Sequence, residues 1–149
     1  MRKFPPHRPR QIEFIQQRSK ADCGIACVAM LAGLLYESVR SVVGNVRSLA
    51  HPESMIEMLE DLEMECEESS KLPARGTALV ALQWNDHRLP GHYVVWDSRR
   101  KQFLDPRSGV VNRRDMMRFA KIDHIWTVRK RTVKEYCDGK KESSRPAGK

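Results

Sequence analysis

Residues 16–30 read QQRSKADCGIACVAM, and the chain changes from polar to apolar at Cys23. The run that follows to Leu35 mixes Ile, Val, Met and Leu with small alanines, so a helix here would be apolar on nearly every side. We therefore expect a buried central helix that begins at Cys23. Cys27, one turn deeper among apolar neighbours, is expected to be a buried and inert thiol.

Cys23 itself occupies a position that suits a nucleophile. A helix N-terminus offers unpaired N–H groups and the positive end of the helix dipole, and both favour a thiolate. Gly24 leaves the backbone open to an approaching substrate carbonyl. A cysteine at the start of an apolar helix is nevertheless more often a small core residue. The nucleophile hypothesis therefore depends on partners elsewhere in the chain.

The remaining segments predict helices first and strands afterwards. Short helices are expected over residues 36–43 and 52–62, the second with an acidic face in solvent. After Pro73 come short segments rich in β-branched and aromatic residues, separated by turns. These predicted strands are TALVALQW (77–84), GHYVVWD (91–97), KQFLD (101–105) and DHIWTVRK (123–130), with a short helix or an irregular crossing over 112–121. Helices followed by an antiparallel sheet indicate an α+β fold.

The length of 149 residues and a hydrophobic content of 40% fit one domain of ordinary size. We place this domain at residues 12–136. A basic arm, residues 1–11, and a basic tail, residues 137–149, have the composition of disordered segments.

The net charge of +8 is concentrated at the two ends of the chain. Residues 1–20 hold six Lys or Arg and one acidic residue, and residues 129–149 hold eight and three, whereas residues 53–71 hold eight acidic residues and one lysine. Such ends are usually solvated tails, and no recognition helix, paired RNA-binding aromatics or zinc finger accompanies them. A nucleic-acid partner is therefore not favoured.

The cysteine spacing and the hydropathy pattern indicate in which cellular compartment the protein is expected. The four cysteines have no CxxC or CxxxH spacing, so we expect neither disulfides nor a metal site, and no cofactor is implied. No stretch approaches the roughly 18 apolar residues of a membrane span. The N-terminus MRKFPPHRPR lacks the apolar region of a secretory signal. We expect a cytoplasmic protein, or one exported without a conventional signal peptide.

A cysteine nucleophile needs a base, and His92 is the best candidate. It opens the predicted strand HYVVW directly after Gly91, so a sheet would hold the ring while the glycine leaves room beside it. The other four histidines lie in the Pro-rich arm, in loops or in the last predicted strand: His7, His51, His87 and His124.

Asp105 is the candidate that would orient His92. If a hairpin turn takes in residues 98–101, position 96 faces 103, and His92 and Asp105 become diagonal neighbours on the same side of the sheet. The alternative interpretation of the LDP sequence is a strand end with a solvated aspartate. Gln17 lies six residues before Cys23 and is a candidate donor to an oxyanion, although Gln16 fits that role equally by composition.

The set Gln17, Asp22, Cys23 and Gly24, followed by GHYVVWD and LDPRSG, resembles the C39 peptidases, papain-like cysteine proteases that trim double-glycine leader peptides. The resemblance covers residues 12–130. It implies a papain-like fold, with the nucleophile helix packed on a C-terminal antiparallel sheet. It also implies that Gln17 serves the oxyanion hole, Cys23 attacks, His92 is the base and Asp105 orients it, on a peptide or protein substrate in a bacterial setting.

Several functions remain compatible with these residues. The leading hypothesis is a cysteine peptidase that acts through a thioester, with cleavage after small residues such as Gly-Gly suggested by the resemblance. A papain-like protein glutamine deamidase would use the same chemistry. From other classes, a basic nucleic-acid-binding module or a non-catalytic interaction module would make Cys23 purely structural. The substrate and the oligomeric state are left open by the sequence.

Overall fold

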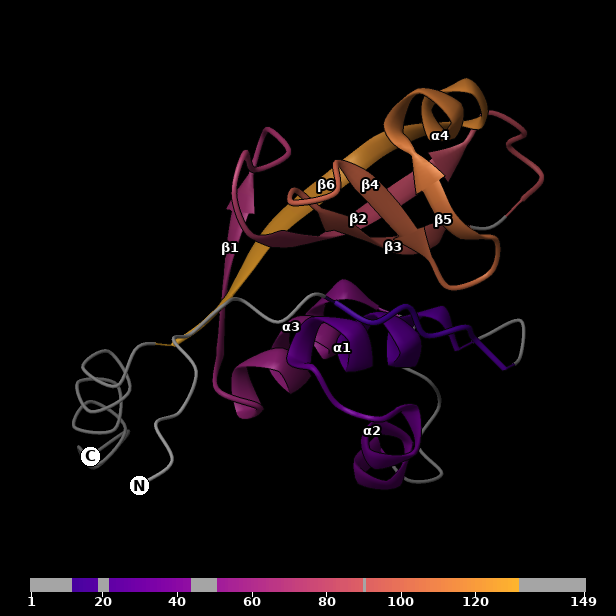
Figure 1. The fold of residues 1–149 in the computed structure, drawn as a ribbon. Helices are drawn as coiled ribbons and strands as arrows, with labels where there is room; N and C mark the ends of the chain where they lie inside the picture. Colours follow the sequence, from indigo (N-terminus) through magenta and orange to yellow (C-terminus); the bar gives the residue numbers. More distant parts are fainter. Residues whose placement is uncertain (1–11, 19–21, 44–50, 90, 132–149) are drawn as a thin grey trace, which may run out of the picture.

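The computed structural model describes residues 12–18, 22–43, 51–89 and 91–131, and these form helices packed against one antiparallel sheet (Figure 1). The predicted basic arm, residues 1–11, and the predicted tail, residues 137–149, lie outside the described residues. Figure 1 shows α1, α2 and α3 grouped on one side of the sheet and α4 on the other side. The structure therefore has the α+β architecture that the order of segments predicts.

The helix α1 (Cys23–Ala32) forms the centre of the core, as expected, with every residue from Gly24 to Leu31 buried. It ends earlier than the apolar run does, because Gly33 has a φ of 69°. That left-handed conformation suits glycine and terminates helices. The helices α2 (Tyr36–Val43) and α3 (Pro52–Asp61) lie at their predicted positions.

The sheet has six strands in the order β1-β6-β2-β3-β4-β5, and every neighbouring pair is antiparallel. The strands are β1 (Met64–Ser69), β2 (Thr77–Trp84), β3 (His92–Asp97), β4 (Gln102–Asp105), β5 (Gly109–Asn112) and β6 (Ala120–Lys130). The segment before β6 forms the short helix α4 (Arg113–Phe119). The four strands predicted from the sequence are β2, β3, β4 and β6.

The two strands that the sequence did not reveal, β1 and β5, are the edges of the sheet. The sequence of β1, MECEES, is dominated by glutamates, which are depleted in strands, and it acquires its conformation by pairing with β6. Only four residues make up β5, too few for a periodic pattern. Charged and short strands are typical sheet edges because they discourage pairing with other chains.

Alternate side chains of the sheet enter two separate cores. Leu79, Val95 and Leu104 belong to the core formed with the three N-terminal helices. Val94 and Phe103 belong to the core on the opposite face, which α4 covers. His92 is the first residue of β3 and Asp105 the last residue of β4, so the two lie together at the end of the β3–β4 hairpin that is remote from its turn.

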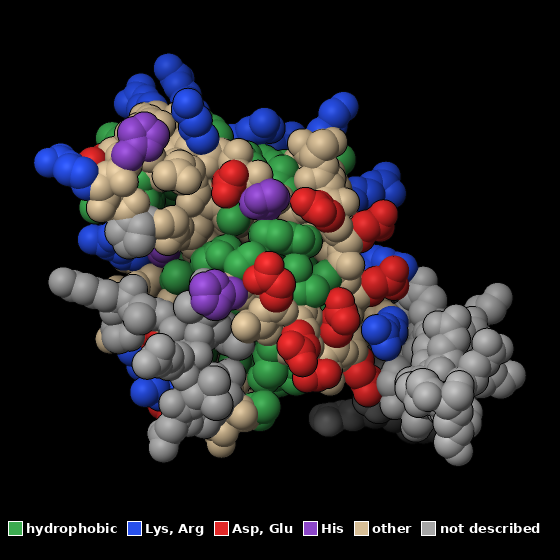
Figure 2. All heavy atoms as spheres, turned by 180° about the vertical axis from the view of Figure 1, so that it is seen from behind, with side chains coloured by type: hydrophobic (Ala, Val, Ile, Leu, Met, Phe, Trp, Pro, Cys, Tyr) green, Lys and Arg blue, Asp and Glu red, His purple; other side chains and the backbone are tan. Residues whose placement is uncertain are grey.

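Acidic side chains gather on one face of the molecule, around a partly apolar centre (Figure 2). The acidic residues of α3 and β1 are mostly exposed, as the solvated acidic face predicted for the third helix requires: Glu53, Glu57, Glu60, Asp61, Glu67 and Glu68. Taken singly, none of the helices in the described part of the chain has the length and apolar composition needed to cross a membrane.

Candidate active site

His92 and Asp105 meet at the start of β3 and the end of β4. Trp96 pairs with Phe103, the register expected from the hairpin turn, so His92 and Asp105 are diagonal neighbours. The imidazole Nε2 lies 2.6 Å from Asp105 Oδ1. Both side chains are buried, at 7% and 1% exposure. The alternative of a solvated aspartate in the LDP turn is therefore wrong.

The carboxylate of Asp105 is held from two directions. The backbone N–H of Arg107 donates to Oδ1 at 2.9 Å, in addition to the hydrogen bond with His92. Burial alone would raise the pKa of Asp105, but the hydrogen bond and charge of His92 and the turn N–H groups hold it below its ordinary value. Asp105 is thus an anion at neutral pH, fixed in position to orient an imidazole.

His92 connects this carboxylate to Cys23. Burial opposes the charged imidazolium, but hydrogen-bonding and electrostatic interactions with Asp105 and Cys23 raise the pKa of His92 from an ordinary 6.5 to about 9. Because Asp105 occupies Nε2, Nδ1 is the nitrogen that faces the thiol. Cys23 is partly exposed at the first residue of α1. A thiol, an imidazole and a carboxylate therefore form one chain of contacts across the two layers.

Trp84, at the end of β2, covers His92, a contact that the sequence analysis did not predict. Its indole stacks on the imidazole with the ring centroids 5.6 Å apart and the planes inclined by 21°. Leu82 pairs directly with His92, so Trp84, two residues further on, lies on the same face. The register of β2 against β3 would have revealed this contact, but it depends on the conformation of the connection over residues 85–91.

Gln17 lies beside the segment that follows Asp105. Its backbone N–H donates to the carbonyl of Pro106 at 2.8 Å, which joins the approach to α1 to the end of β4. Gln17 is half-buried, whereas Gln16 is exposed. The structure thus separates two glutamines that composition did not separate, and the oxyanion role of Gln17 stays a prediction.

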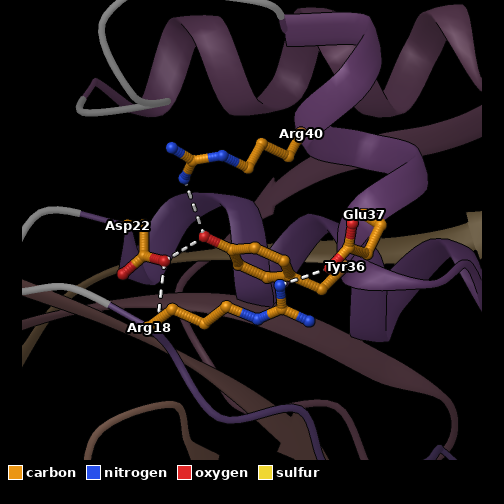
Figure 3. A network of polar contacts seen from close by, with 5 residues as sticks. All are labelled: Arg18, Asp22, Tyr36, Glu37 and Arg40. Atoms are coloured by element: carbon orange, nitrogen blue, oxygen red, sulfur yellow. Dashed lines mark hydrogen bonds and ion pairs between the residues drawn. The ribbon is translucent and has the colours of Figure 1, made fainter.

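Asp22, immediately before Cys23, is buried in a network that the sequence did not predict (Figure 3). Its carboxylate makes no hydrogen bond that caps α1 and instead accepts hydrogen bonds from the Arg18 N–H at 2.9 Å and from the Tyr36 hydroxyl. Arg40 donates to the same hydroxyl at 3.1 Å. The Arg18 guanidinium lies over the Tyr36 ring, 4.3 Å from its centroid. This network anchors the start of α1 to α2.

The other thiols and histidines of the described chain lie in different environments. Cys27 is fully buried, its thiol donates to the Tyr93 carbonyl at 3.4 Å, and burial raises its pKa, as expected for an inert core thiol. Burial also raises the pKa of Cys66 to about 11. His51, His87 and His124 are exposed. Among the residues that the structure places, no three His, Cys, Asp or Glu side chains gather to hold a metal ion.

Two solved structures share this fold. A double-glycine motif protease from an AMS/PCAT transporter, in complex with the leader peptide, has a TM-score of 0.60 and 20% identity, covering 81% of this chain and 93% of the other. The peptidase domain of Streptococcus ComA, a bifunctional ABC transporter of a quorum-sensing pathway, has a TM-score of 0.59 and 15% identity, covering 81% of this chain and 100% of the other. No family model matches the sequence, and neither does any curated protein.

The chain therefore has the papain-like α+β fold of double-glycine, C39-type peptidase domains, as its motifs predicted. The similarity covers most of this chain. At identities of 20% and 15% it establishes the fold, and the chemistry has to be argued from the side chains of this chain.

Proposed function

We propose that this protein is a cysteine peptidase that cleaves a peptide bond through a thioester on Cys23. One observation carries the proposal: His92, hydrogen-bonded to Asp105 at 2.6 Å, also interacts with Cys23, the first residue of α1. A nucleophile, a base and a group that orients the base are the parts that acyl transfer requires. The fold shared with two solved peptidases supports the same conclusion.

The raised pKa of His92 makes the imidazole an effective base for the Cys23 thiol. With a pKa of about 9, the imidazole takes the proton of Cys23 as the sulfur attacks the carbonyl carbon, and a tetrahedral oxyanion forms. His92 then donates its proton to the leaving amine as the C–N bond breaks. Water, deprotonated by the neutral His92, attacks the thioester and releases the acyl product.

The oxyanion needs donors near Cys23. We assign this role to the backbone N–H of Cys23 and the side-chain amide of Gln17, which its hydrogen bond to Pro106 holds beside the catalytic strand. Asp22 is a positioning residue, because its buried carboxylate, directly before Cys23, accepts a hydrogen bond from the Arg18 N–H.

The substrate that we propose is a peptide segment with small residues, such as Gly-Gly, before the cleaved bond. One of the similar structures is a double-glycine motif protease bound to a leader peptide, which supports a peptide ligand for this fold. Residues without side chains would allow the peptide backbone to approach Cys23 and Gly24 closely.

Digestion of a proteome-derived peptide library, with mass-spectrometric sequencing of the new ends, tests the proposal. The wild-type protein is expected to cut, and Cys23→Ala is expected to lose all cutting above background. Cys66→Ala is the matched control, because it removes a half-buried thiol in the edge strand β1, which two strands separate from β3. Equal cleavage by wild type and Cys23→Ala would refute the proposal. A mass gain of about one unit in intact glutamine-containing peptides, without cleavage, would identify a deamidase on the same residues.

A further inference from the structure

An apolar pocket of about 400 Å³ is lined in part by Trp84, the residue that stacks on His92. Its walls come from the end of β2, the connection that follows it, and α4: Trp84, Asn85, Asp86, Leu89, Arg118 and Phe119. Phe119 is 64% exposed and Leu89 is 43% exposed, high values for large apolar side chains in the described structure. Single exposed apolar residues are ordinary, but several that line one hollow indicate a binding surface.

The walls of this pocket are held by hydrogen bonds between backbone segments. The Asn85 N–H donates to the Phe119 carbonyl at 2.8 Å, and the Asn85 side-chain amide donates to the Arg118 carbonyl at 2.9 Å. The Leu89 N–H donates to the Asp86 carbonyl at 3.0 Å and closes the turn. The two exposed apolar side chains are therefore presented by a fixed backbone, as in a preformed binding pocket.

Trp84 connects the pocket to the reaction. Its indole lines the pocket and also stacks on His92 at 5.6 Å. In the proposed chemistry His92 gives its proton to the leaving amine, so the part of the substrate that departs as the amine must lie on the His92 side of the cleaved bond. The pocket therefore adjoins the leaving-group side of the site.

We propose that this pocket binds an apolar side chain, aliphatic or aromatic, of the segment that departs as the amine product. The proposal rests on Cys23 and His92 being the reacting pair. Phe119 and Leu89 supply the contact area, and their exposure in the free protein is explained by the ligand that covers them. Specificity would thus be set on both sides of the bond, by small residues before it and by an apolar residue after it.

The alkylation rates of Cys23 test this proposal without an identified substrate. The probes are iodoacetamide and its N-benzyl, N-phenethyl and N-phenylpropyl derivatives, each rate being divided by that of glutathione with the same probe. At least one aryl probe is expected to exceed iodoacetamide by about tenfold at Cys23, because partial burial of an aromatic group is sufficient for that factor. Phe119→Ala is expected to remove most of this preference, and Val42→Ala, which deletes an exposed apolar side chain of α2, is expected to keep it.

Two results would overturn the proposal. In the first, every aryl probe alkylates Cys23 at about the same normalised rate as iodoacetamide does. In the second, an aryl probe reacts faster than iodoacetamide at Cys23, and Phe119→Ala keeps that difference. Either result is distinct from failure of the peptidase proposal, in which Cys23 would react with iodoacetamide no faster than Cys66 does. The peptide library supplies a second readout: apolar residues should be enriched just after the cleaved bond for the wild type, and the enrichment should be lost with Phe119→Ala.

Discussion

The folded structure raises the pKa of His92. Its hydrogen bonds to Asp105 and Cys23 outweigh the effect of burial and give it a pKa of about 9 in the folded protein, against an ordinary 6.5. A raised pKa means that folding favours the protonated form, so this contribution to stability is complete below about pH 6.5 and is lost as the pH rises through about 9. The midpoint of thermal unfolding should therefore fall over that interval more steeply for wild type than for His92→Gln.

Asp105→Asn tests whether the carboxylate of Asp105 keeps His92 protonated. Loss of the anion should lower the pKa of His92 and move the alkaline limit of kcat/KM to lower pH. At pH 8 we expect kcat/KM to fall by about tenfold, the change in the protonated fraction of His92 that a drop of about two units from a pKa of about 9 produces. Asp97→Asn is the control, since Asp97 is another buried aspartate of the same hairpin that contacts Arg100 rather than His92. A pH profile that Asp105→Asn leaves unshifted would contradict the assigned role.

The helix α1 depends on α2 for the position of its first residue. Tyr36→Phe deletes one hydroxyl and leaves the buried carboxylate of Asp22 without that donor. A buried polar group that loses a hydrogen bond typically costs about 1–3 kcal/mol, so we expect a loss of this size in the free energy of unfolding, measured with urea. Arg40→Ala, which removes an exposed donor to the same hydroxyl, should cost less.

The same variant separates positioning from folding. If Asp22 positions the Cys23 N–H for the oxyanion, Tyr36→Phe should lower kcat at an unchanged KM, in conditions where the variant is fully folded. A loss of stability with an unchanged kcat would mean that the network serves folding alone.

The elements that the sequence predicted were those with a strong local signal. The apolar run after Cys23 is long enough to specify α1, and the turn after Asp97 is short enough to specify the β3–β4 register, which in turn placed Asp105 beside His92. The edge strands β1 and β5 have no such signal, because the first is acidic and the second has only four residues. Trp84 and the Asp22–Tyr36 contact were missed because both depend on how separate elements pack.

At the scale of the whole molecule, the residues of the proposed active site meet only when both layers are folded. Cys23 belongs to the helical layer, whereas His92 and Asp105 belong to the sheet. The hydrogen bond from Gln17 to Pro106 joins the layers at the site itself. Charge is also unevenly distributed over the molecule. Acidic residues gather over α3 and β1, although the net charge of the chain is +8.

The central claim is that His92 and Asp105 activate Cys23, and alkylation of one molecule at two thiols tests it directly. Cys66 is an internal standard, because it is also partly exposed but has a pKa of about 11. Peptide mapping after brief exposure to iodoacetamide at pH 7 should show Cys23 modified well before Cys66, and His92→Ala should slow the modification of Cys23 while leaving that of Cys66 unchanged. Equal modification of the two thiols in the wild-type protein would contradict the account.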